Sequence, residues 1–142
     1  MQATREPRTE DKAQQDLREL FDAAAAKSLA VIDPLDAEPD MASFLHAVKK
    51  LPEQRCFVVQ LFKESFSESF YMRHEPSQFL MFCMHDLRWP EVREFITAKR
   101  NAEIEKRGSR VSGVWSDILE AFEDHWEPAR YYEEFKKNRE HA

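Results

Sequence analysis

Glycine is nearly absent from this sequence. The chain of 142 residues has only Gly108 and Gly113, whereas an average protein contains about 7% glycine. Tight β-hairpins usually need glycine, Asn-Gly or Asp-Gly at their turns, and neither dipeptide occurs here. Adjacent valine or isoleucine residues, which favour strands, occur only at Val31-Ile32 and Val58-Val59. These shortages exclude a fold built mainly from β-hairpins and predict an all-α protein.

Cysteine is scarce as well. The two cysteines, Cys56 and Cys83, lie far apart, and no C-x-x-C motif occurs. The usual ligand spacing of a structural zinc site is therefore missing. Apolar residues lie next to both cysteines, so we predict two buried free thiols in a protein of a reducing compartment.

Long apolar runs and a basic excess are also missing. No run approaches the roughly 20 apolar residues that a membrane-spanning helix needs. The first residues, MQATREPRTEDKAQQ, lack the apolar core of a signal peptide, so we predict a cytoplasmic protein without membrane contact.

The net charge of −6 argues against a nucleic-acid partner, because proteins that bind nucleic acids usually carry a basic surface. A glycine-rich nucleotide loop is excluded by the two isolated glycines, and we predict no cofactor.

Aromatic residues are abundant. The chain is 42% hydrophobic and has eleven Phe and three Trp, a load that disordered chains lack. Its length fits one domain, and such a domain buries roughly two-thirds of the surface of the unfolded chain. We predict a disordered tail over residues 1–8 and a single all-α domain over residues 9–142.

Apolar residues recur at helical spacing along most of the chain. Thr9 or Asp11 is a candidate cap for a first helix that ends near Ala30, and Pro34 and Pro39 exclude a continuous helix after it. A short helix is predicted through Lys50, and a longer one after Pro52 carries Cys56, Val59, Phe62 and Phe66. Further helices are predicted at 77–89, at 90–107, after a cap at Ser112 or Ser116, and from Pro128 onward.

Three prolines separate these segments at equal intervals of 38 residues: Pro52, Pro90 and Pro128. Proline lacks an amide N–H and presets φ near −65°, so it is favoured at the first position of a helix. We therefore predict that each proline starts the second helix of an αα-hairpin. The stretches LPEQRCFVV and WPEVREFIT match in register, and the pattern resembles HEAT-like helical repeats. A helical bundle with coincident prolines is the alternative.

One pair of residues favours an enzyme. His85-Asp86, with His46 before it and Asp117 or Asp124 after it, resembles the metal-binding set of HD-type phosphohydrolases. The resemblance implies a divalent metal that activates a water for attack on a phosphoester. Additional ligands would come from His74 or His125. The alternative is a solvated His–Asp pair near a helix end, where the helix dipole favours a protonated histidine.

Charge is distributed unevenly over the second half of the chain. Residues 88–110 hold seven Lys or Arg and four Glu, whereas residues 117–134 hold seven Asp or Glu and one Arg. One interpretation is that the two segments attract each other within the fold. The other is that an acidic and aromatic C-terminal hairpin binds a basic surface of another protein, because aromatic anchors and steering charges suit an interface. The predicted contact residues are Glu123, Asp124, Trp126, Glu127, Tyr131 and Tyr132.

We accordingly predict a non-catalytic protein-binding protein, such as a small acidic inhibitor, an immunity or antitoxin-like protein, or an adaptor. A metal-dependent phosphohydrolase with His46, His85 and Asp86 as ligands is the alternative. A third hypothesis comes from Phe62, Phe66 and Phe70, which are spaced by four residues and share one helix face. This face either packs in the core or forms the interface of a homodimer.

Overall fold

The computed structural model describes residues 7–67, 77–108 and 113–140, and within them the protein is all-α, as predicted. These residues form seven α-helices and three 3-10 helices, without a β-strand. In chain order they are α1 (Pro7–Ala30), η1 (Pro34–Ala37), α2 (Glu38–Lys50), η2 (Pro52–Gln54), α3 (Arg55–Ser67), α4 (Ser77–Leu87), α5 (Pro90–Arg107), α6 (Gly113–Glu120), η5 (Glu127–Tyr131) and α7 (Glu133–Glu140). None of the helices in these ranges is long and apolar enough to cross a bilayer.

The ends of the helices follow the local sequence. Pro90 opens α5, and Trp89 before it has the extended backbone of an N-cap residue. Pro52 opens η2, which leads directly into α3. Pro128 lies at the start of η5 rather than at the start of α7. The first helix begins at Pro7, inside the predicted tail, and residues 1–6 lie outside the described part of the chain.

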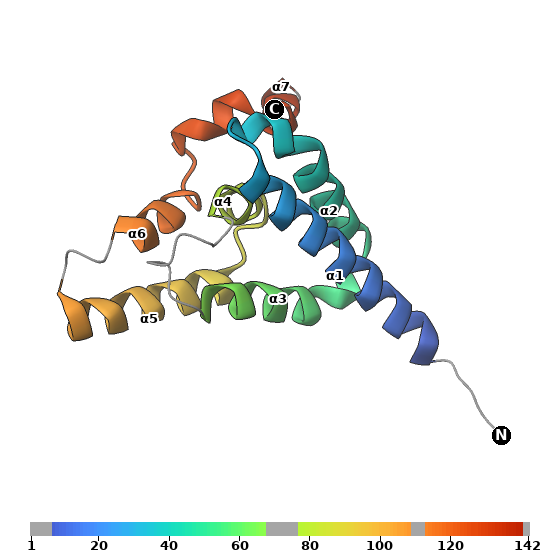
Figure 1. Cartoon of the computed structure of the whole chain (residues 1–142), viewed down its shortest axis with the longest axis horizontal. Coiled ribbons are helices and arrows are strands. Elements are labelled where there is room, and N and C mark those ends of the chain that lie inside the picture. Colours follow the sequence, from blue (N-terminus) through green and yellow to red (C-terminus); the bar gives the residue numbers. More distant parts are fainter. Residues whose placement is uncertain (1–6, 68–76, 109–112, 141–142) are drawn as a thin grey trace.

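The expected αα-hairpins, and with them the HEAT-like stack, are not confirmed. Helices α1 and α2 lie side by side, whereas α3 and α5 run along another side of the molecule (Figure 1). Helix α5 packs against α3 and α6 instead of folding back on α4. The corner between α4 and α5 contains Arg88, whose φ of 50° lies in the left-handed region. A proline fixes where a helix starts, but the direction of the new helix depends on such corners and on packing.

Helix α4 lies at the centre of the molecule and is seen end-on in Figure 1. It contacts α1, α2 and α6, and every residue from Phe79 to His85 is buried. Phe79 packs edge to face against Phe21 and Phe44, with ring centroids 5.1 and 5.5 Å apart. Such aromatic pairs are stabilising beyond the area that they bury, so the abundant phenylalanine forms the core of this fold.

The helix face that carries the spaced phenylalanines belongs to this core. Phe62 and Phe66 are fully buried, and the Phe62 ring lies 6.1 Å from that of Phe21. The core interpretation is confirmed for these two residues, and a homodimer interface on them is wrong because neither ring is accessible. Phe70 lies outside the described residues. Of the two predicted buried thiols, Cys83 is buried and Cys56 is exposed.

Candidate functional site

Two of the predicted contact residues belong to the core. Trp126 is 4% exposed and Tyr132 is 2% exposed. The Trp126 ring lies 5.0 Å from the ring of His85, and the Tyr132 ring lies 5.0 Å from that of Phe82. Helix α6 ends at Glu120, and the turns that follow direct both aromatic rings toward α4. Their predicted role as surface anchors is therefore wrong.

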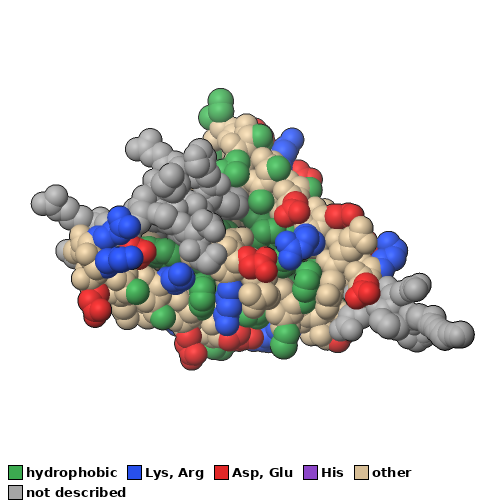
Figure 2. Space-filling model, turned by 60° about the horizontal axis from the view of Figure 1, so that its bottom comes forward, with side chains coloured by type: hydrophobic (Ala, Val, Ile, Leu, Met, Phe, Trp, Pro, Cys, Tyr) green, Lys and Arg blue, Asp and Glu red, His purple; other side chains and the backbone are tan. Residues whose placement is uncertain are grey.

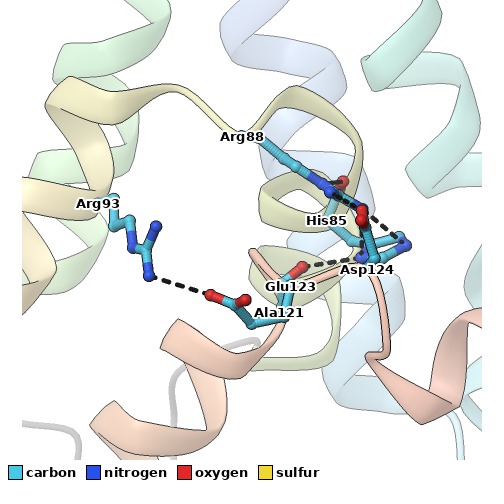
Figure 3. Close-up of polar contacts among 6 residues, drawn as sticks. All are labelled: His85, Arg88, Arg93, Ala121, Glu123 and Asp124. Carbon is cyan, nitrogen blue, oxygen red and sulfur yellow. Dashed lines mark hydrogen bonds and ion pairs between the residues drawn. The ribbon is translucent and has the colours of Figure 1, made fainter.

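Two of the three acidic members of the predicted set, Glu123 and Asp124, pair with the basic segment of the same chain (Figure 3). Arg88 binds Asp124, and Nη2 of Arg93 lies 3.0 Å from Oε2 of Glu123. The hydrogen bond from Arg88 lowers the pKa of Asp124. These contacts confirm that the two charged segments attract each other within the fold, although exposed ion pairs of this kind contribute little to stability.

An acidic residue of the basic segment is paired with a neighbouring helix. Arg55 from α3 forms two hydrogen bonds with the Glu91 carboxylate, with distances of 2.7 and 2.9 Å, and its guanidinium lies 4.5 Å from the centroid of the Trp89 ring. On the face that Figure 2 shows, basic and acidic side chains intermingle. A phosphate-binding surface needs an excess of basic groups, which this face does not offer.

The histidine and aspartate residues of the alternative metal set do not come together. His46 Nε2 lies 2.9 Å from Oε1 of Glu134, and Asp86 pairs with Lys49 at 2.7 Å. His85 Nδ1 donates a hydrogen bond of 2.8 Å to the carbonyl oxygen of Ala121, so His85 and Asp86 serve different neighbours. Asp117 is exposed on α6 and His125 lies 3.7 Å from Glu120. Among the described residues, which exclude His74, no three His, Cys, Asp or Glu side chains are arranged to hold a metal.

His85 is the one histidine of α4, and it is 8% exposed. Nη2 of Arg88 lies 3.5 Å from both nitrogens of the His85 ring. Burial lowers the pKa of His85 below its ordinary value of 6.5, and the charge of Arg88 lowers it further, while the Ala121 hydrogen bond and the carboxylates of Asp86 and Asp124 oppose the shift. The neutral ring is therefore the form that fits the folded protein.

This arrangement predicts that the protein loses stability as the pH falls through 6.5. The unfolded chain then takes up a proton at His85 that the folded protein resists, so the free energy of unfolding decreases toward lower pH. Urea denaturation between pH 7.5 and 5 should show this decrease, and His85→Gln should reduce the slope. His125→Gln, which changes a histidine whose side chain is 72% exposed, is the matched control. An equal slope for His85→Gln would contradict the assignment.

A groove of about 670 Å³ lies over His85. Its charged side chains are already paired within the chain, Arg88 with Asp124, Asp86 with Lys49, and Arg130 with Glu127 at 3.6 Å. The lining therefore carries both signs in compensated pairs. It gives no basis for choosing an anionic or a cationic ligand.

A second surface has a clearer chemistry. Among the described residues, the exposed large apolar side chains include Ile32 (102% exposed), Leu35 (38%) and Tyr131 (51%). We refer to these three residues as the apolar edge. They lie on the α1–α2 connection and on η5, which meet at the top of Figure 1. The fourth exposed residue, Leu29, is in the last turn of α1.

The apolar edge borders a groove of about 280 Å³ between η1 and η5. The lining residues are Asp33, Pro34, Leu35, Gln78, Pro128, Tyr131 and Tyr132. Only Tyr131 and Tyr132 of these belong to the contact set predicted from the sequence. Asp33, Pro34 and Leu35 were missed because VIDPLDAEPD shows no helical period and ends the first helix. The sequence did contain a signal. Ile32 and Leu35 are large apolar residues in a segment rich in proline and aspartate, which has no helix or strand pattern that would bury them.

Polar contacts hold the two sides of this groove in place. Asp33 Oδ1 accepts the amide N–H of Leu35 at 3.0 Å and so caps η1. The Glu38 carboxylate accepts the amide N–H groups of Glu133 and Glu134 at 3.1 and 2.8 Å. Because these amides begin α7, Glu38 caps a helix that is distant in sequence and joins α2 to the end of η5.

Substitution of Glu38 by glutamine should loosen this junction. The amide side chain keeps one acceptor and loses the charge, so we expect the free energy of unfolding to fall by about 1 kcal/mol. Hydrogen exchange of the Glu134 and Phe135 amides should accelerate more than exchange in α4. The matched variant Glu53→Gln, at an exposed position in η2, should change neither quantity. Unchanged protection of α7 in Glu38→Gln would contradict the capping role.

Comparison with known proteins adds no assignment, because no family model, curated protein or solved structure matches this chain.

Proposed function

We propose that this protein is a non-catalytic binding protein that attaches its apolar edge to a basic protein surface. The observation that carries the proposal is that exposed Leu35 and Tyr131 line one groove, with the exposed Ile32 immediately before Asp33 of its lining. Exposed apolar groups that cluster and have a polar surround are typical of interaction sites, whereas scattered ones are not. A cytoplasmic setting agrees with the two free thiols, which persist in a reducing compartment.

The charge around the apolar edge selects the partner. Residues 31–38 and 127–134 contain six carboxylates and one arginine. That arginine, Arg130, donates to the hydroxyl oxygen of Tyr131 at 2.7 Å and lies 3.6 Å from Glu127, so its charge is partly compensated. An acidic surround attracts a basic partner and accelerates the encounter. This partner chemistry is the one inferred from the acidic C-terminal segment, with the contact surface moved toward η1.

The proposal divides the contact set predicted from the sequence into two roles. Tyr131 and Glu127 are exposed and take part in partner contact. Trp126 and Tyr132 support the surface from below. Asp124 and Glu123 hold the C-terminal segment to Arg88 and Arg93. A small inhibitor, an immunity or antitoxin-like protein, and an adaptor all work through a surface of this kind, since each needs binding and no chemistry.

Affinity capture with matched variants tests the proposal. The wild-type chain, the double variant Leu35→Gln/Tyr131→Gln and the single variant Leu29→Gln are immobilised and exposed to lysate of the cells that make the protein. We expect a basic protein to be retained by the wild type and by Leu29→Gln and to be lost from the double variant. Leu29 is an exposed apolar residue outside the groove lining, so it controls for general adhesion. Equal retention by all three chains, or no retained protein, would overturn the proposal.

A further inference from the structure

We propose that the groove between η1 and η5 receives one lysine or arginine side chain of the partner, with its aliphatic stem between apolar walls and its cationic head at Asp33. This inference rests on the proposed function and adds to it the chemical group that the surface recognises.

The walls of the groove suit an aliphatic stem. Pro34, Leu35, Pro128 and Tyr131 line it, and the two prolines lie at the starts of 3-10 helices. Proline fixes the backbone φ, so these walls need little ordering when a ligand enters, which favours affinity. The volume of about 280 Å³ is below the range of about 300–1,000 Å³ that is common for drug-sized ligands. It fits a single long side chain better than a free metabolite.

The polar groups of the groove suit a cationic head. Asp33 uses Oδ1 to cap η1, and within the described part of the chain its Oδ2 has no hydrogen-bond partner. Gln78 adds an amide to the lining, and no lysine or arginine belongs to it. Lysine and arginine side chains bury their stems against apolar surface and keep the charged head among polar groups. A neutral apolar anchor would fill the same walls but would remove water from Asp33 without replacing its hydrogen bonds.

The electrostatic environment of Tyr132 agrees with this assignment. Tyr132 is the buried aromatic residue of the lining. Burial raises its pKa to about 12, and the carboxylates of Glu38 and Asp33 contribute in the same direction. Negative potential from two separate elements thus converges on this end of the groove. An anionic ligand would meet repulsion here, whereas a cation would be stabilised.

Small probes test the inference on the intact protein. Wild-type chain labelled with ¹⁵N is titrated with n-butylguanidinium and n-butylammonium, which represent the two side chains, and with n-butylurea, a neutral analogue of similar shape. We expect both cations to shift the amide signals of Leu35 and Tyr131 in a saturable way. Because a hydrogen bond to a charged group is about twice as strong as a neutral one, we expect n-butylurea to bind at least about tenfold more weakly.

Asp33→Asn separates the charge from the structure of the groove. Asparagine caps helices as well as aspartate does, so η1 should remain intact while the charge is lost. We expect the affinity for both cations to fall about tenfold, as for the loss of a charge-assisted hydrogen bond. Asp11→Asn changes an exposed carboxylate in α1 and should leave the affinity unchanged.

The outcomes distinguish this inference from the proposed function. Equal binding of n-butylurea, or full affinity in Asp33→Asn, would show an apolar pocket and overturn the cation assignment. No shift at Leu35 and Tyr131 with any probe would overturn it as well. In each case the capture experiment, which depends on Leu35 and Tyr131 and on no small cation, can still succeed and leave the proposed function standing. Cation binding at the groove without any captured protein would support a cation site there but would overturn the proposed function and, with it, the assignment to a partner's side chain.

Discussion

Replacement of Phe82 by alanine is expected to lower the free energy of unfolding by about 3–5 kcal/mol, the range for loss of a fully buried phenylalanine. Phe82 is 0% exposed, and its ring centroid lies 5.0 Å from those of Tyr132 and of Phe135. It therefore joins the central helix α4 to the junction of η5 and α7. Alanine would leave a cavity that α4 cannot close without moving. Urea denaturation followed by circular dichroism measures the change.

Phe57→Ala provides the comparison for this variant. Phe57 is half-buried on α3 and packs against the margin of the core, where the Arg18 guanidinium lies 5.8 Å from its ring centroid, so its loss should cost less and should leave the α7 amides protected from hydrogen exchange. In Phe82→Ala the same amides should exchange faster, because Tyr132 and Phe135 lose a common neighbour. A loss below about 1 kcal/mol for Phe82→Ala, well under the usual range, would contradict the packing described for α4.

Tyr131→Ala is expected to weaken partner binding by about 2 kcal/mol, or roughly thirtyfold, which is the usual threshold for an interface hot spot. Tyr131 is 51% exposed and borders the groove between η1 and η5. Because its ring contributes little to the core, the free energy of unfolding should change by no more than about 0.5 kcal/mol. Calorimetric titration with the captured partner measures the affinity, and urea denaturation measures the stability.

Together, affinity and stability show whether Tyr131 contacts the partner or only holds η5 in place. A loss of affinity with unchanged stability places Tyr131 in the interface. Equal losses in both would mean that Tyr131 acts by holding η5 in place. Unchanged affinity would remove Tyr131 from the contact surface and leave the apolar edge with Ile32 and Leu35.

The all-α class and most of the core could be predicted from the sequence. Two glycines exclude most hairpin turns, and the helical spacing of residues such as Leu17 and Phe21 is set by the period of the helix itself. The packing of helices on one another could not be predicted in the same way. Pro52 and Pro90 determine where helices begin, but the left-handed backbone of Arg88 and the contacts of α4 determine where they point.

The candidate site was predicted only in part because aromatic and acidic residues in alternation fit two environments. Trp126 continues the spacing of Trp115 and Phe122, which is a core pattern, yet it is next to Glu127 and Asp124, which indicate a surface. Trp126 is buried because α6 ends at Glu120 and the following turns direct its ring inward. No capping residue in the sequence marks this helix end. Whereas Trp126 fits two patterns, Leu35 fits none, because its segment lacks any period from which exposure or burial could be predicted.

Photo-crosslinking from the apolar edge tests the central claim most directly. Ile32 is replaced by p-benzoylphenylalanine, because it is fully exposed and immediately precedes the lining residue Asp33 without lining the groove itself. A second chain carries p-benzoylphenylalanine in place of Gln60, an exposed residue of α3. After irradiation in lysate, we expect a single adduct with a basic protein from position 32 and none from position 60. Adducts of equal yield from both positions, or an adduct from position 60 alone, would contradict the assignment of this edge as the binding surface.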